Sequence, residues 1–90
     1  MLVYLVELIG TFVFLSVILR VGQPIPIAVA LLSAIYFGGS ISGGHFNPAV
    51  SVMMYLNKAL SLDDLPLYVV SQIAGGVAAL CFHKMIPVKA

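Results

Sequence analysis

The residues best suited to chemistry lie together in the stretch 42–50, which reads SGGHFNPAV. Asn47 followed by Pro48 is a helix-start signal. An Asn side chain caps an unpaired backbone N–H, and Pro at the first helical position lacks only a donor that would have no partner. The glycines before it disfavour a regular helix. The stretch therefore predicts free backbone carbonyls followed by a helix N-terminus, which carries roughly half a positive charge. Such a site suits the binding of a small polar molecule through hydrogen bonds.

Covalent chemistry is not indicated elsewhere in the sequence. His45, Cys81 and His83 lack the spacing of a metal site, and no nucleophile with a neighbouring base or phosphate-binding loop is recognisable. Cys81 is the only cysteine, which excludes a disulfide within the chain, and the net charge of +1 gives no reason to expect a nucleic-acid partner. We therefore expect neither an enzyme nor a protein with a metal or cofactor.

The composition is that of a protein surrounded by lipid. Of the 90 residues, 62% are hydrophobic and 8% are charged, and the mean hydropathy is +1.18. A soluble domain has about 25% charged residues, so this chain has too few to cover a surface facing water. The charged side chains leave long uncharged runs between them: Glu7, Arg20, Lys58, Asp63, Asp64, Lys84 and Lys89. We expect an integral protein that crosses the bilayer several times, in a membrane that the sequence does not specify.

Three apolar segments are long enough to cross a membrane of about 30 Å hydrocarbon thickness. They cover approximately residues 2–19, 25–41 and 66–86. The first is not interpreted as a signal peptide, because it lacks a basic start and contains Glu7. Residues 42–56 form a loop and a helix from Pro48 of about 13 Å, which is too short to span. The predicted fold is therefore an all-α membrane protein, with three transmembrane helices and one re-entrant half-helix in a single unit.

Two local signals mark the third apolar segment. Ser61 and Asp64 have the spacing of a capping box, and Pro66 follows inside the first helical turn. Small residues four positions apart then predict a face in close contact with another helix. The pairs are Ser71 with Gly75, Ala74 with Ala78, and Gly75 with Ala79.

Three stretches resemble signatures of the aquaporin and glycerol facilitator family, the major intrinsic proteins. They are residues 7–12 (ELIGTF), 42–51 (SGGHFNPAVS) and 68–75 (YVVSQIAG). Together they are similar to the N-terminal half of an aquaporin only. The resemblance implies a pore lined by Asn47, Pro48 and Ala49. It also implies a ladder of backbone carbonyl acceptors from Gly43, Gly44, His45 and Phe46.

The resemblance implies that Glu7 and Gln72 brace this loop. A carboxylate inside a span costs at least about 2.5 kcal/mol, so Glu7 should face the protein interior, where it would accept hydrogen bonds from the loop backbone. The alternative is that Glu7 reaches toward the membrane surface. For the His45 ring, anchoring of the loop and plain packing are equal alternatives.

The chain departs from the family because it has one such half instead of two inverted halves. The simplest repair is an antiparallel homodimer, which requires insertion in both orientations. If the N-terminus and Lys58 share one side, Arg20, Lys84 and Lys89 lie on the other. This charge bias is weak, so it permits both orientations.

The selectivity filter is also expected to differ from that of a strict water channel. The family places an Arg after its second motif, whereas the equivalent position here is Val50. Counting along the second span gives Ile27, and an inverted partner would add approximately Ile35. We expect a wider or more apolar, uncharged constriction formed by Ile27, Ile35, Val50 and Gly44.

The leading functional hypothesis is a passive channel for water or small uncharged solutes such as glycerol. Two antiparallel copies would form the pore in lipid, and four such pores would assemble as the family's tetramer implies. One alternative is a non-conducting half-channel that associates with a full-length aquaporin and modulates it. Another alternative is a truncated fragment without function.

Overall fold

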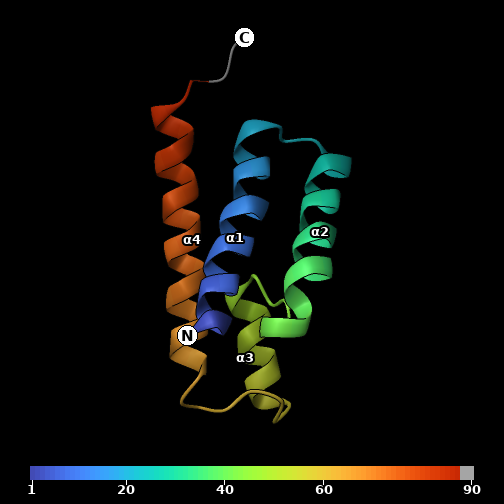
Figure 1. The fold of residues 1–90 in the computed structure, drawn as a ribbon, viewed down its shortest axis with the longest axis vertical. Helices are drawn as coiled ribbons and strands as arrows, with labels where there is room; N and C mark the ends of the chain where they lie inside the picture. The colour runs from blue at the N-terminus through green and yellow to red at the C-terminus, as the bar shows by residue number, and fades with distance from the viewer. Residues whose placement is uncertain (88–90) are drawn as a thin grey trace.

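The chain folds into helices joined by short loops. The computed structural model describes residues 1–87, so Lys89, which enters the charge comparison above, lies outside the described residues. The helices are α1 (Leu2–Arg20), α2 (Pro24–Ser42), α3 (Pro48–Leu56) and α4 (Leu65–Met85) (Figure 1). Three of them, α1, α2 and α4, are long and apolar enough to cross a membrane. The predicted all-α membrane fold is confirmed.

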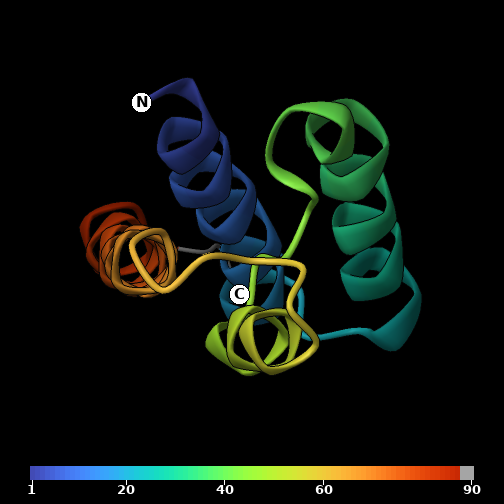
Figure 2. The same cartoon turned by 90° about the horizontal axis from the view of Figure 1, so that it is seen from below.

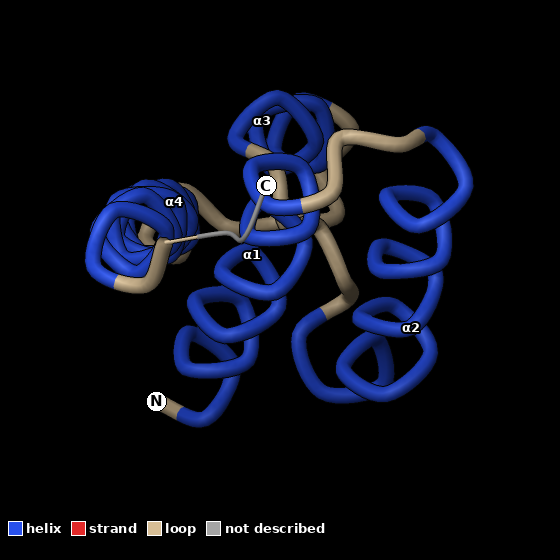
Figure 3. Tube along the Cα trace, turned by 90° about the horizontal axis from the view of Figure 1, so that it is seen from above, coloured by secondary structure: helices blue, strands red, loops and turns tan. Residues whose placement is uncertain are grey.

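Helix α1 is the centre of the bundle. It packs against both α4 and α2, and α3 packs against α4. Figure 1 shows α1 between the other two long helices, with α3 beside only one part of its length. Viewed from either end, α3 lies on one side of α1, between α4 and α2 (Figure 2, Figure 3). With nine residues, α3 is about 13 Å long. It therefore enters the bundle from one end and stops inside it.

Close packing of α1 on α4 depends on Gly75. A Cβ atom at this position would lie 2.5 Å from the Leu8 carbonyl oxygen and 3.1 Å from Thr11 Cβ. Ala79, one turn further along α4, is fully buried, whereas Ala78 is exposed. Of the predicted small-residue pairs, Gly75 with Ala79 therefore faces α1, and Ala74 with Ala78 does not form that contact.

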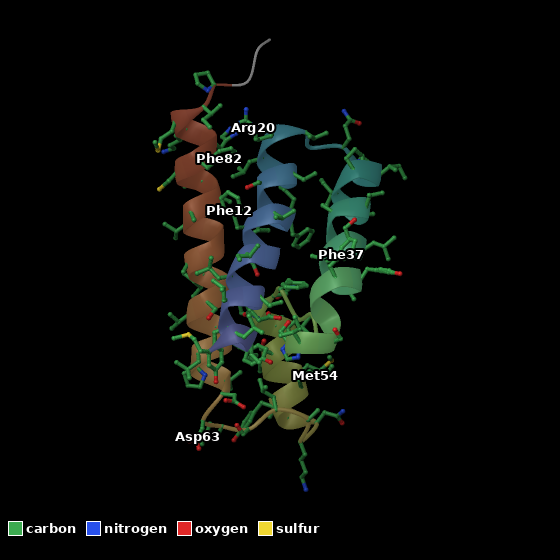
Figure 4. All side chains as sticks on the ribbon, in the orientation of Figure 1. Phe12, Arg20, Phe37, Met54, Asp63 and Phe82 are labelled. Atoms are coloured by element: carbon green, nitrogen blue, oxygen red, sulfur yellow. The ribbon has the colours of Figure 1, made fainter. Side chains whose placement is uncertain are left out.

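The distribution of polarity is the reverse of that in a soluble protein. The most completely buried side chains include Glu7, Gln72 and Ser51, while Phe37 is 81% exposed and Leu32 is 66% exposed. Figure 4 labels Phe37 on α2. Exposed apolar side chains around a polar interior are what a surrounding bilayer requires.

The predicted capping box forms only in part. The backbone N–H of Asp64 donates to Ser61 Oγ at 3.2 Å, but the Asp64 side chain makes no cap bond to α4. Instead its Oδ1 accepts from the Tyr4 hydroxyl at 2.6 Å. This bond, and a weaker contribution from Ser61, hold the pKa of the Asp64 carboxyl below its usual value. The Asp64 carboxylate therefore bonds to Tyr4, at the start of α1, and does not cap the neighbouring helix α4.

The opposite end of the bundle is closed by Arg20. Its guanidinium lies 5.5 Å from the centroid of the Phe82 ring and donates to the Ile86 carbonyl at 2.7 Å. Figure 4 shows Arg20 and Phe82 at one end and Asp63 at the other. These contacts join the last turns of α1 and α4 where the chain leaves the apolar zone.

Candidate functional site

Helix α3 begins as its sequence predicts, with Asn47 as cap and Pro48 in the first turn. Asn47 is extended, with φ −162° and ψ 125°, and its Oδ1 accepts from the Ala49 N–H at 2.8 Å. This bond fixes the orientation of the amide, so the Nδ2 donors point away from the helix. Asn47 is exposed, and it stands at the end of α3 that lies inside the bundle (Figure 1). The site therefore offers N–H donors at a positive helix end, partway along the bundle.

Glu7 is the central acceptor behind the loop that precedes α3. Its Oε2 accepts from the His45 N–H at 3.1 Å and from Ser42 Oγ at 2.8 Å. Its Oε1 accepts from the Phe46 N–H at 2.8 Å and from Gln72 Nε2 at 2.9 Å. The side chain is 0% exposed, so it does not reach for the membrane surface. One carboxylate from α1 thus binds the loop, the end of α2 and the side of α4.

Ser51 is a second junction, and it was not among the predicted site residues. Its Oγ lies 2.8 Å from Gln72 Nε2 and 2.8 Å from His45 Nδ1. Tyr68 was also missed: its hydroxyl donates to the Ser42 carbonyl at 2.7 Å, and its ring lies 4.7 Å from the His45 ring. The His45 ring is therefore both hydrogen-bonded and packed. Helical spacing could have found both residues, since Ser51 lies one turn after Asn47 and Tyr68 one turn before Gln72.

The loop between α2 and α3 is held in an unusual backbone conformation. Gly43 and Gly44 have φ of 88° and 66°, and Phe46 also has a positive φ, 52°. A non-glycine residue in this region costs about 1–3 kcal/mol. The Phe46 ring is 2% exposed and fills the space over Gly10 and Gly38, where added Cβ atoms would meet it. Burying a Phe side chain contributes about 1.5–3 kcal/mol, which offsets the strain and fixes the predicted carbonyl stretch in place.

The residues of the predicted constriction are only partly brought together within one chain. A Cβ atom at Gly44 would lie 3.4 Å from Ile35 Cγ1, so these two residues are neighbours. Ile27 is on the same helix, about 12 Å further along it at 1.5 Å per residue. Val50 is in the first turn of α3. Within the described residues, Ile27 is therefore not a neighbour of Ile35 or Gly44.

A groove of about 520 Å³ runs between α1 and α4 beyond the inner end of α3. Its lining comprises Thr11, Phe14, Leu15, Phe46, Asn47, Pro48, Gln72, Ile73, Gly76, Val77 and Leu80. Two of these residues contribute buried oxygens, Thr11 Oγ1 and Gln72 Oε1, that have no hydrogen-bond partner within residues 1–87. Such unpaired buried oxygens are rare in folded proteins, and these two belong to residues that line the groove.

The described part of the chain contains no group of three His, Cys, Asp or Glu side chains that could hold a metal ion. What it holds together is a polar loop, a helix end and a buried carboxylate, all inside an apolar bundle. These features define a multi-pass membrane protein with a re-entrant half-helix, the architecture of half an aquaporin.

Sequence comparison identifies the family. The chain belongs to the family described as "Major intrinsic protein", whose profile matches residues 20–90. Members of this family are membrane channels, not enzymes. Together with the three apolar helices, this membership establishes an integral, multi-pass membrane protein.

Several curated proteins are similar to the chain. A "Glycerol uptake facilitator protein-like 6" of Lactiplantibacillus plantarum is 42% identical over 86 residues, which cover 84% of this chain and 39% of the relative. An "Aquaporin Z" of Photorhabdus laumondii is 34% identical over 88 residues, covering 81% of this chain and 38% of the relative. An "Aquaglyceroporin-4" of Botryotinia fuckeliana is 43% identical over 53 residues, covering 58% of this chain and 7% of the relative. The chain thus spans about two fifths of the length of the first of these relatives. No solved structure matches it.

Proposed function

We propose that the chain forms a passive channel for water or small uncharged solutes when two copies pair in antiparallel orientation. The observation that carries this proposal is the position of Asn47. It presents amide donors at the inner end of a helix that stops partway through the bundle, next to an open groove (Figure 1). A second, inverted copy would supply the opposite half of the path.

The chemistry at Asn47 suits an uncharged solute with an oxygen atom. A water molecule that accepts from Asn47 Nδ2 has its own hydrogens turned away, which interrupts a chain of hydrogen-bonded waters that would conduct protons. The positive end of α3 disfavours cations at the same point. Carbonyls of residues 43–46 supply acceptors on the approach. Paired Asn47 residues from two copies would double this arrangement at the centre of the membrane.

The groove beside α1 and α4 supports pairing with a second copy. Along α4 it extends from Gln72 to Leu80, about 12 Å at 1.5 Å per residue, close to the length of about 13 Å estimated for α3. We propose that α3 of the inverted copy occupies this groove, because the matched relatives are more than twice the length of this chain.

The solute is proposed to be small and neutral, with water and glycerol as the first candidates. The predicted constriction carries no charged side chain: it consists of Ile27, Ile35, Val50 and Gly44. An apolar ring accommodates the carbon backbone of a polyol better than a charged filter would. The relative from Lactiplantibacillus plantarum is named a glycerol uptake facilitator, which is consistent with such a solute.

Swelling of liposomes followed by stopped-flow light scattering tests conduction. Purified protein should accelerate water or glycerol entry, and Asn47→Asp should reduce solute entry while preserving α3, because Asp is as good a helix cap as Asn. Proton flux measured in the same liposomes should remain low in the unmodified protein. Lack of solute entry in liposomes that contain paired protein would contradict the proposal. If swelling appears only when a full-length aquaporin is present, the chain acts as a modulator instead.

A further inference from the structure

The hydrogens of the buried network can be counted from its geometry. Gln72 Nε2 lies 2.9 Å from Glu7 Oε1 and 2.8 Å from Ser51 Oγ. A flipped amide would turn its oxygen toward the Glu7 carboxylate, two acceptors face to face, so the nitrogen must be on this side. An amide nitrogen has two hydrogens, and both are used here. Ser51 Oγ therefore accepts from Gln72.

The remaining hydrogen of Ser51 decides the state of His45. Ser51 Oγ and His45 Nδ1 are 2.8 Å apart, and either atom could donate. If Nδ1 donated, the Ser51 hydroxyl would need another acceptor. Ser51 is 0% exposed, and the Asn47 carbonyl one turn earlier already accepts from the Val50 and Ser51 N–H groups. Donation from Ser51 to Nδ1 uses the Ser51 hydrogen and the Nδ1 lone pair, so neither atom of this contact is left without a partner.

We propose that Ser51 is the positioning residue of the loop, and that its hydroxyl holds His45 as the neutral tautomer with the proton on Nε2. That nitrogen is turned toward Gly43, where an added Cβ atom would lie 3.3 Å from it. His45 then contributes an N–H donor within a stretch whose other contribution is carbonyl acceptors. This inference goes beyond the proposed channel activity and holds whether or not the chain conducts.

His45 is contacted from three helices. From α1, the Glu7 carboxylate accepts the His45 backbone N–H. From α4, the Tyr68 ring lies 4.7 Å from the imidazole. From α3, Ser51 faces Nδ1. Of these neighbours, Ser51 bonds to a ring nitrogen, so it is placed to set the tautomer.

Nitrogen-15 NMR of the histidine rings, in the full chain in detergent micelles, tests the assignment. His83→Gln identifies the His45 signals. In the unmodified protein at neutral pH, Nδ1 should show the shift of an unprotonated acceptor and Nε2 that of a protonated nitrogen. Ser51→Thr, which keeps the hydroxyl, should retain this pattern. Ser51→Ala should lose it and give a mixture of tautomers, while Ser71→Ala should change nothing.

A protonated Nδ1 in the unmodified protein would overturn the proposal, and so would a Ser51→Ala spectrum with the same single tautomer. Ser71 is a matched control because its hydroxyl bonds to the Leu67 carbonyl of its own helix. If Ser51→Ala does not fold, the spectra of the unmodified protein and Ser51→Thr still decide the question. The NMR signals do not depend on conduction, so failure of conduction and failure of the tautomer assignment are separate results.

Discussion

Replacing Glu7 by Gln should weaken the hydrogen bond to the His45 N–H more than the hydrogen bond to the Phe46 N–H. The amide keeps one oxygen and turns the other position into a donor. If NH₂ replaces Oε1, it meets the Phe46 N–H and Gln72 Nε2, two donors that cannot both adapt. If NH₂ replaces Oε2, it meets the His45 N–H and the Ser42 hydroxyl, and a hydroxyl can rotate to accept. The variant should therefore adopt the second orientation.

The loss of stability follows from this orientation of the amide. One backbone bond to a charged group is lost, at His45, and such a bond contributes about 1.5–3 kcal/mol. The His45 amide should then exchange with solvent deuterons about 10- to 100-fold faster, since each 1.4 kcal/mol is a factor of ten. The Phe46 amide, whose acceptor oxygen is kept, should change less.

Hydrogen exchange of assigned amides in micelles measures this directly. Asp63→Asn is the matched carboxyl-to-amide control, because Asp63 is exposed in the loop before α4; its effect on stability should stay within about 0.5 kcal/mol. If hydrogen exchange of the His45 and Phe46 amides accelerates equally, or at neither residue, the distinct roles assigned to the two carboxylate oxygens of Glu7 are refuted.

Three further predictions concern packing, pH and the pore. Gly75→Ala should destabilise the bundle by about 1–3 kcal/mol in denaturant titrations, because its Cβ would meet the Leu8 backbone, whereas Gly76→Ala meets only the flexible end of a Leu side chain. The lowered pKa of Asp64 stabilises the fold above its ordinary value of about 3.9, and this contribution is lost as the pH falls further. Tyr4→Phe should remove much of this acid dependence from thermal unfolding curves recorded between pH 6 and pH 3; an unchanged dependence would contradict the assigned cause. Asn47→Ala should lose a helix cap as well as solute flux, and a stability equal to that of Asn47→Asp would argue against the capping role.

Local sequence signals were sufficient to predict the helices of this chain. The apolar runs predicted the spans, and Asn47 with Pro48 predicted the start of α3, because a cap and a fixed φ act within one turn. The small-residue pattern predicted a contact face on α4 but could not choose between its possible stripes. Gly75 faces α1 because the buried Gln72 lies on the same side of the helix.

Contacts between distant parts of the chain were not predictable in the same way. The Tyr4 hydroxyl reaches Asp64 across 60 positions and binds the carboxylate that the second half of the capping box would use. Ser51 meets Gln72 across 21 positions, and its role becomes visible only when the donors around Glu7 are counted. The positive φ of Phe46 also has no local signal, since it is imposed by the burial of the ring.

The most direct test of the central claim is the orientation of the chain in one membrane. In a Cys81→Ser background, a cysteine at Leu62, which is 62% exposed in the loop before α4, can be labelled with a membrane-impermeant maleimide before and after lysis of sealed vesicles. Antiparallel pairing predicts that an equal share of the cysteines is reached from each side, and that pairs can be isolated by chemical cross-linking. Labelling from one side alone, with no cross-linked pair, would contradict a channel built from two inverted copies.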